Sequence, residues 1–305
     1  MFDIIGKRFW FFLISAGVIL ISIISLVTFG LKAGIEFKSG SMMILNFEQA
    51  VDQTELEHEL AIMGYANAIV QGTGEGYFSI RSHPLNDQER TVLKSALTAK
   101  FGSVTEEGFY YVDPVIARKT ARIAAIAVAV AALGILLYVT WAFHRMPKPF
   151  RYGTCAIIAL IHDALIALGV FSILGAILNW EINLMFITGV LAVIGYSVNN
   201  TVVVFDRIRE NLKIGVSPDF EVVVNNSLVE TLGRSLNTSL TTLIVVLALL
   251  FFVGATIQNF AVVLLIGIIA GTFSSVCIAP PLLVVWEKGE WGRFIQWLPL
   301  RQAKA

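Results

Sequence analysis

The most regular feature of the sequence is a series of long apolar runs. Six runs are predicted to be membrane-spanning helices, at residues 9–29, 120–143, 153–174, 182–205, 236–255 and 260–286. Each has about 20 residues or more, and a helix of that length crosses a hydrocarbon layer of roughly 30 Å. One long polar segment, 31–119, separates the first run from the second. The pattern predicts a polytopic α-helical membrane protein with one domain outside the bilayer.

The polar segment 31–119 has the periodicity of a small α+β domain. Strand-like stretches occur at 41–47, 68–70, 77–80 and 109–112, and helical spacing begins near Asp52 and near Asn86. The resulting order, β-α-β-β-α-β, is that of a ferredoxin-like unit. We therefore expect four parts, namely the N-terminus with the first transmembrane helix (1–30), the ferredoxin-like domain (31–119), a five-helix transmembrane bundle (120–286) and a C-terminal tail (287–305).

Composition agrees with a membrane protein and excludes several other classes. Hydrophobic residues make up 56% of the chain and charged residues only 14%, as is typical of polytopic membrane proteins. The formal net charge is zero, so nucleic acid is not an expected partner. The sequence contains no phosphate-binding loop, no zinc-protease motif and no paired-cysteine metal spacing. We therefore expect no enzymatic activity, no cofactor and no metal site.

The distribution of basic residues predicts how the helices are oriented. Lysines and arginines gather at the N-terminus, in 144–151, in 206–235 and in the C-terminal tail, while the short loops 175–181 and 256–259 have none. Loops that remain in the cytoplasm are enriched in these residues. The prediction is a multi-pass protein of the cell (inner or plasma) membrane, with both termini in the cytoplasm and residues 31–119 outside.

Polar residues inside the apolar runs are the candidate functional residues. His162 and Asp163 lie near the middle of the third run, Asn199 and Asn200 lie within the fourth, and Arg234 opens the fifth. Such groups are costly in lipid, so they normally face other helices and have partners there. Two interpretations follow. The groups form an ion relay, with Arg234 as a partner of the asparagines, or they are structural hydrogen bonds between helices.

A charged cluster follows the fourth run at its predicted cytoplasmic end. It consists of Asp206, Arg207, Arg209 and Glu210. The segment 206–235, which begins with this cluster, also has apolar residues at helical spacing. This segment is either a helix in the membrane interface or a plain connecting helix.

Three stretches of the chain, 159–164, 195–211 and 234–242, carry a resemblance to a known family. They resemble the SecF subunits of the SecD/SecF family of protein-export membrane proteins, in the RND superfamily. The resemblance implies that the chain pairs with a SecD-like subunit to make twelve spans. It also implies that the pair uses an ion gradient, such as the proton motive force, to move the outer domains and assist preprotein translocation through the SecYEG channel. A weaker match is 34–40, where Glu36 and Ser39 depart from the family pattern G-x-D-F-x-G-G.

The resemblance also implies roles for two of the intramembrane residues. Arg234 matches the arginine within the membrane of the family, and Asn200 stands where the family usually has an aspartate that carries the proton together with a SecD carboxylate. An amide does not titrate, so Asn200 cannot hold the transported proton. Either Asp163 and the SecD carboxylate carry it, or the site binds Na⁺, which prefers carbonyl and carboxylate oxygens. A single replacement at position 200 that disables coupling would give the same sequence.

Two other functions remain open from the sequence. The first is half of an RND-type transporter for small molecules or lipids, although the single outer segment is small for a drug pocket. The second is a passive assembly scaffold of the translocase, in which the polar residues only fix how the helices pack. Membrane lipid is a partner under all three interpretations.

Overall fold

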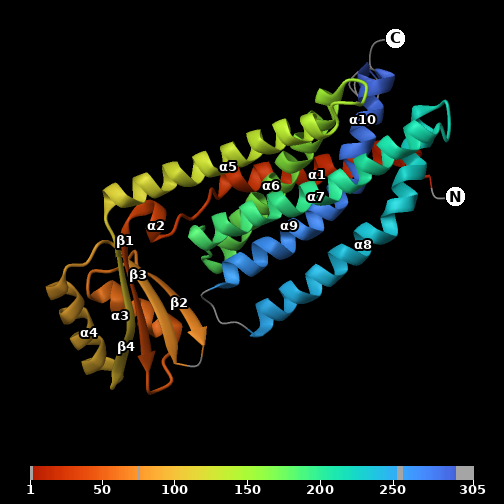
Figure 1. The fold of residues 1–305 in the computed structure, drawn as a ribbon. Coiled ribbons are helices and arrows are strands. Elements are labelled where there is room, and N and C mark those ends of the chain that lie inside the picture. Colours follow the sequence, from red (N-terminus) through yellow and green to blue (C-terminus); the bar gives the residue numbers. More distant parts are fainter. Residues whose placement is uncertain (1–2, 75, 253–256, 293–305) are drawn as a thin grey trace, which may run out of the picture.

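The molecule has two parts, a bundle of long helices and a small sheet domain at one end of it (Figure 1). The residues that the computed structural model describes are 3–74, 76–252 and 257–292. Helix α1 (Arg8–Thr28) leads into the sheet domain and α5 (Pro114–Ala142) leads out of it, so the domain is inserted between two helices. The beginning of α1 lies at the end of the bundle away from the sheet, beside α10 (Ala279–Lys288) (Figure 1).

The sheet domain has the element order β-α-β-β-α-β that the sequence predicts. Its elements are β1 (Gly40–Phe47), α3 (Gln53–Ile62), β2 (Ile69–Gly74), β3 (Tyr77–Ser82), α4 (Asp87–Phe101) and β4 (Val104–Val112). The strands form one antiparallel sheet with the order β2-β3-β1-β4. Strand β4 begins earlier than predicted because it pairs with the whole of β1, with Val104 opposite Phe47. A short helix that was not predicted, α2 (Ile35–Lys38), precedes β1.

Local signals in the sequence explain where the two domain helices begin. The Asp52 carboxylate accepts hydrogen bonds from the first backbone amides of α3, and Asn86 forms a capping box with Glu89 at the start of α4. Alternate residues of β1 are buried in the core of the domain. One of them, Phe47, makes edge-to-face contacts with Phe78 and Phe101. The domain therefore has a hydrophobic core of its own.

Ser39 has a backbone conformation that normally requires glycine. Its φ is 69° and its ψ is 160°, a region that costs other residues about 1–3 kcal/mol. This is one of the two positions where the sequence departs from the family pattern. We expect Ser39→Gly to increase the free energy of unfolding by about 1 kcal/mol, since glycine also loses more chain entropy on folding and this offsets part of the gain. Thermal unfolding of the variant measures the change, and a decrease in stability would contradict the assignment of strain.

The spans agree with the six predicted from the sequence. Six helical segments are long and apolar enough to cross a membrane within the described part of the chain. They are α1, α5, α6 (Pro149–Leu178), α7 (Leu184–Ile214), α8 (Phe220–Phe252), and α9 (Gln258–Cys277) with α10. The last residues predicted for the fifth span, 253–255, lie outside the described residues.

The predicted sixth span is two helices rather than one. Helix α9 ends at Cys277 and α10 begins at Ala279, with Pro280 and Pro281 in its first turn. Proline has no backbone N–H to donate to the preceding turn, but it fits the first turn of a new helix. The two prolines therefore account for the break at Ile278.

Segment 206–235 does not form a separate helix, and its place relative to the membrane interface stays a prediction. Helix α7 continues to Ile214, and α8 begins at Phe220 and runs without interruption into the fifth span. Three apolar residues of this part of α8, Val223, Val224 and Leu228, are completely buried inside the protein, whereas Val222 is exposed. The segment is the junction of two long helices.

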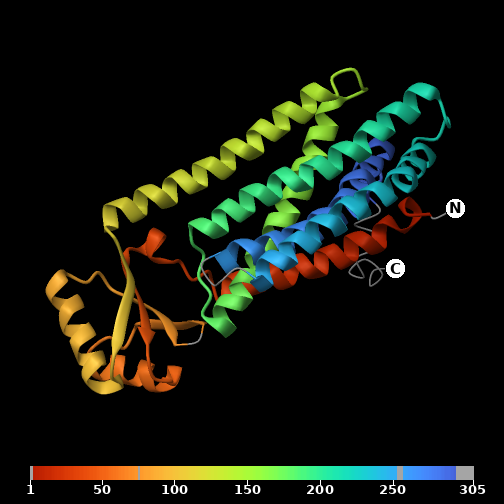
Figure 2. The ribbon, with the colours of Figure 1, turned by 60° about the horizontal axis from the view of Figure 1, so that its bottom comes forward.

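Helices α6, α7 and α9 are the most buried of the spans, while α1, α5 and α8 leave most of their surface exposed. Figure 2 shows α5 and α1 on opposite sides of the bundle. Small residues let the central helices approach closely. A Cβ atom at Gly267 of α9 would lie 2.1 Å from a methyl carbon of Val193 on α7, and one at Gly271 would lie 2.9 Å from the Cβ of Ser197. Glycines that allow such approaches are typical of helix packing in membranes. The close approach brings polar side chains of three helices together.

Candidate functional site

The Asp163 carboxylate is the point where the three central helices meet through hydrogen bonds. Its Oδ1 lies 2.9 Å from Nδ1 of His162 on the same helix, α6. Its Oδ2 accepts a hydrogen bond of 2.6 Å from the Ser197 hydroxyl of α7 and one of 2.8 Å from the Ser274 hydroxyl of α9. Only 1% of Asp163 is exposed. The carboxylate therefore holds α6, α7 and α9 together in the interior of the bundle.

The surroundings of Asp163 offer hydrogen-bond donors but no lysine or arginine among the described residues. The Ser197 and Ser274 hydroxyls donate to the carboxylate, and Nδ1 of His162 can donate as well when it carries the ring proton. No lysine or arginine of the described residues pairs with it, and only His162, if protonated, offers a positive charge. An ionised carboxylate in such a place is costly without a counter-charge. Binding a proton or a cation there would remove this cost.

His162 connects Asp163 to an apolar cleft. The ring is 3% exposed and stacks on Phe273 of α9, and its Nε2 has no hydrogen-bond partner among the described residues. It lines a cleft of about 410 Å³ between α1, α6 and α10, together with residues such as Phe12 and Leu282. With Asp163 ionised, Nδ1 carries the proton that it donates to the carboxylate. Nε2 is then left as an acceptor.

The two candidate asparagines lie on different faces of α7. Asn200 is 3% exposed, and its Nδ2 has no hydrogen-bond partner among the residues described. It lies one helical turn from Ser197, which binds Asp163 directly. Asn199 is exposed on the other side of the helix. The structure thus places Asn200, but not Asn199, in the protein interior, one helical turn from a residue that binds the carboxylate.

Arg234 does not contact the asparagines in this structure. It is exposed on α8 and has no carboxylate within ion-pair distance in the described part of the chain. It lines a polar cleft of about 400 Å³ between α7 and α8. The residues of the charged cluster form ion pairs, Arg207 with Glu210 and with Glu230 of α8, and Arg209 with Asp206.

A second line of polar contacts joins α7, α8 and α9. The Tyr196 hydroxyl donates a hydrogen bond of 3.0 Å to the Ser239 hydroxyl, which lies 2.6 Å from the Thr272 hydroxyl. The Ser235 hydroxyl, one turn from Ser239 on α8, is buried with no hydrogen-bond partner among the described residues. Asn200 Nδ2 and Ser235 Oγ are thus two buried polar atoms that have no hydrogen-bond partner among the described residues.

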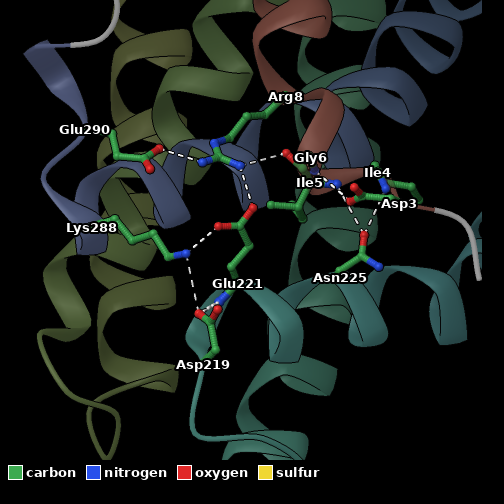
Figure 3. A network of polar contacts seen from close by, with 10 residues as sticks. All are labelled: Asp3, Ile4, Ile5, Gly6, Arg8, Asp219, Glu221, Asn225, Lys288 and Glu290. Atoms are coloured by element: carbon green, nitrogen blue, oxygen red, sulfur yellow. Dashed lines mark hydrogen bonds and ion pairs between the residues drawn. The ribbon is translucent and has the colours of Figure 1, made fainter.

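Figure 3 shows a separate network at the end of the bundle away from the sheet. Arg8 of α1 is 4% exposed, and its guanidinium donates to Glu221 of α8 and to Glu290 at distances of 2.6 Å each (Figure 3). Lys288 of α10 binds Glu221 as well, and Asn225 of α8 accepts hydrogen bonds from the backbone amides that precede α1. The network ties together the beginning of α1, the beginning of α8 and the end of α10.

Sequence reasoning selected Asp163 and His162 but did not identify the two hydroxyl groups that bind Asp163. Ser197 and Ser274 are common residues in membrane helices, where hydroxyls usually only support packing. One signal was available, because Gly267, Gly271 and Ser274 follow each other at spacings of four and three residues. Such a stripe of small residues marks the face of α9 that packs on α7.

The fold and the site define a class of protein. Six spans with a domain inserted after the first, and buried polar groups at the centre of the bundle, are the architecture of a polytopic membrane protein with an intramembrane polar site. The family model described as "Protein export membrane protein SecD/SecF, C-terminal" matches residues 92–289.

Individual relatives point to the SecF branch of this family. A protein translocase subunit SecF of Anaerolinea thermophila is 42% identical over 295 residues, which cover 95% of this chain and 96% of the relative. The crystal structure of SecDF from Thermus thermophilus, described as a translocon-associated membrane protein, superposes with a TM-score of 0.83 at 32% identity. The match covers 94% of this chain and 39% of that one. A SecDF structure in a super-membrane-facing form has a TM-score of 0.68 at 30% identity, with coverages of 97% and 40%. The chain belongs to the SecF proteins of the SecD/SecF family.

Proposed function

We propose that this chain is the SecF subunit of an accessory complex that uses an ion gradient to assist preprotein export through the Sec channel. The SecF relatives support the role in translocation. The observation that carries the coupling to an ion gradient is the buried Asp163 carboxylate, which binds three helices and has no lysine or arginine partner among the described residues. Protonation or cation binding at Asp163 changes the contacts that fix α6, α7 and α9.

The orientation and the partners follow from the same proposal. We place both termini in the cytoplasm and the sheet domain outside the membrane, because the segments 144–151 and 206–235 are rich in lysine and arginine while the loops 175–181 and 256–259 have none. Arg118, Lys119 and Arg122 at the start of α5 are the exception, and snorkelling accommodates them. The sheet order β2-β3-β1-β4 with helices after β1 and β3 supports a ferredoxin-like domain. A SecD-like subunit would cover the exposed apolar surface of the outer helices, and the fused SecDF structures support that pairing.

Either a proton or Na⁺ fits the chemistry of the site. A proton would bind Asp163 itself. The carboxyl group, which accepts hydrogen bonds from the Ser197 and Ser274 hydroxyls when ionised, would then also have one O–H donor. Na⁺ would use the carboxylate and the same two hydroxyl oxygens as ligands. We favour the proton, because Nδ1 of His162 contacts the carboxylate and its second ring nitrogen, Nε2, has no partner among the described residues. An imidazole in this position can pass a proton to or from the carboxylate.

The test is export of a slowly released preprotein in inverted membrane vesicles that contain this chain with its SecD-like partner. A proton or Na⁺ gradient is imposed after ATP has been removed. We expect the proton gradient to complete export and an uncoupler to prevent it. Equal export with and without either gradient would contradict the proposal and favour the passive scaffold. Gradient-driven movement of a small molecule without any effect on preprotein would favour the RND-type transporter.

Two asparagine variants make the same assay specific for the site. Asn200→Asp adds a titratable group in the interior, one turn from Ser197, and should increase proton-driven export. Asn199→Asp makes the same chemical change on the exposed face of α7 and should leave proton-driven export unchanged. Equal effects of the two substitutions would count against a relay in the interior.

A further inference from the structure

The loop that joins α6 to α7, residues 179–183, is fastened to the sheet domain. Its Glu181 carboxylate forms an ion pair of 2.9 Å with Arg81 on β3. Its Ile182 makes two backbone hydrogen bonds to the linker before β1, donating to the Lys32 carbonyl at 2.7 Å and accepting from the Gly34 amide at 2.8 Å. We call these contacts the loop clamp. They join the sheet domain to the bundle by side chains and by backbone.

The ion pair of the loop clamp is shielded from water. Glu181 is 7% exposed, and 18% of the Arg81 side chain is exposed. Burial raises the pKa of Glu181 and the Arg81 guanidinium opposes that shift, while the nearby Glu36 adds to it and Lys38 opposes it. Because Arg81 comes from the sheet domain and Glu181 from the bundle, the buried carboxylate keeps its ion-pair partner only while the two parts stay docked.

The same loop is connected to each helix that binds Asp163. It continues directly into α6, which carries His162 and Asp163, and into α7, which carries Ser197. It is also bound to α9, because Asn259 at the beginning of that helix donates a hydrogen bond of 2.9 Å to the Glu181 carbonyl. The helices that hold the carboxylate therefore converge on the loop clamp.

We propose that the loop clamp is the joint through which a rearrangement of α6, α7 and α9 around Asp163 moves the sheet domain. The inference rests on the proposed function, because it takes Asp163 to be the ion site. Helices are stiff elements, so a change in their packing at Asp163 displaces their ends at the loop. The ion pair and the two backbone hydrogen bonds then carry that displacement to β3 and to the linker before β1.

Hydrogen–deuterium exchange on the full chain, in complex with its SecD-like partner, tests whether the clamp holds the loop. Arg81→Gln removes the charge and keeps much of the side chain. We expect amide exchange in 31–36 and 179–184 to become about tenfold faster, as the loss of one charge-assisted hydrogen bond implies. The matched control is Arg90→Gln, which breaks the Arg90–Glu106 ion pair within the sheet domain and should leave exchange in both segments unchanged.

The export assay in inverted vesicles tests whether the clamp transmits motion. Arg81→Gln should lose most of the gradient-stimulated export, and Arg90→Gln should keep it. A disulfide provides a rescue, because Ala33 and Ile182 are partners in a parallel backbone bridge and this spacing suits a disulfide. Oxidation of Ala33→Cys/Ile182→Cys in the Arg81→Gln protein should restore gradient-stimulated export, and reduction should remove it again.

Three results would overturn the inference. The first is unchanged exchange in Arg81→Gln, and the second is faster exchange with full gradient-stimulated export. The third is a disulfide that blocks export in a protein with Arg81 intact, since the contact would then have to open. Failure of the proposed function looks different. The wild-type complex would show no gradient-stimulated export, while the exchange comparison would still decide whether Arg81 holds the loop.

Discussion

Replacing Asp163 by asparagine should abolish gradient-stimulated export while leaving the complex assembled. Asparagine has nearly the same shape, so Ser197 and Ser274 keep an oxygen acceptor, but an amide binds no proton at physiological pH. A coupling free energy between two sites is typically about 1–3 kcal/mol, so its loss corresponds to about a 5- to 150-fold change. The measurement is the ratio of export with and without a proton gradient in inverted vesicles.

The matched control for Asp163→Asn is Asp206→Asn. Asp206 lies on α7 near its end, is exposed and pairs with Arg209. Exposed ion pairs contribute little, so this substitution should preserve gradient-stimulated export. Export that survives in Asp163→Asn with its full gradient dependence would show that Asp163 is a structural hydrogen-bond acceptor only.

The largest effect on stability is expected from Arg8→Ala. The Arg8 guanidinium is buried and neutralises Glu221 and Glu290, and the substitution leaves both carboxylates without this partner (Figure 3). Removing one partner of a buried ion pair costs about 3–5 kcal/mol. Because Lys288 still pairs with Glu221, we expect the lower part of that range. Thermal unfolding of the detergent-purified complex measures the loss.

Arg145→Ala serves as the control for Arg8→Ala. Arg145 is an exposed arginine in the segment between α5 and α6, without an ion-pair partner among the described residues. Its substitution should change stability by less than about 0.5 kcal/mol, as is usual for surface positions. Equal losses in the two variants would contradict the assignment of Arg8 as the centre of the network.

The sequence was sufficient for the parts of the fold that depend on local pattern. The spans could be predicted from apolar runs of membrane length. The beginnings of the two domain helices could be predicted from the capping residues Asp52 and Asn86. Asp163 could be chosen because a carboxylate within an apolar run is rare and costly. Each of these inferences uses residues that are close together in the chain.

The parts that sequence reasoning missed depend on contacts between distant residues. Arg8 looked like an ordinary cytoplasmic charge, and its burial follows from partners 213 and 282 residues away. Arg81 and Glu181 are 100 residues apart, and neither stands out in the sequence. The choice of Ser197 and Ser274 over the other hydroxyls depends on how α7 and α9 are rotated about their axes. That rotation is set by glycines such as Gly271, whose role is visible only in the packed bundle.

The most direct test of the account is infrared difference spectroscopy of the reconstituted complex as the pH is lowered on one side of the membrane. A carboxyl group that takes up a proton in an apolar interior gives a C=O band of the neutral acid. We predict such a band in the wild-type complex, its loss in Asp163→Asn and its retention in Asp206→Asn. A band that persists unchanged in Asp163→Asn would contradict the claim that Asp163 is the group that binds the proton.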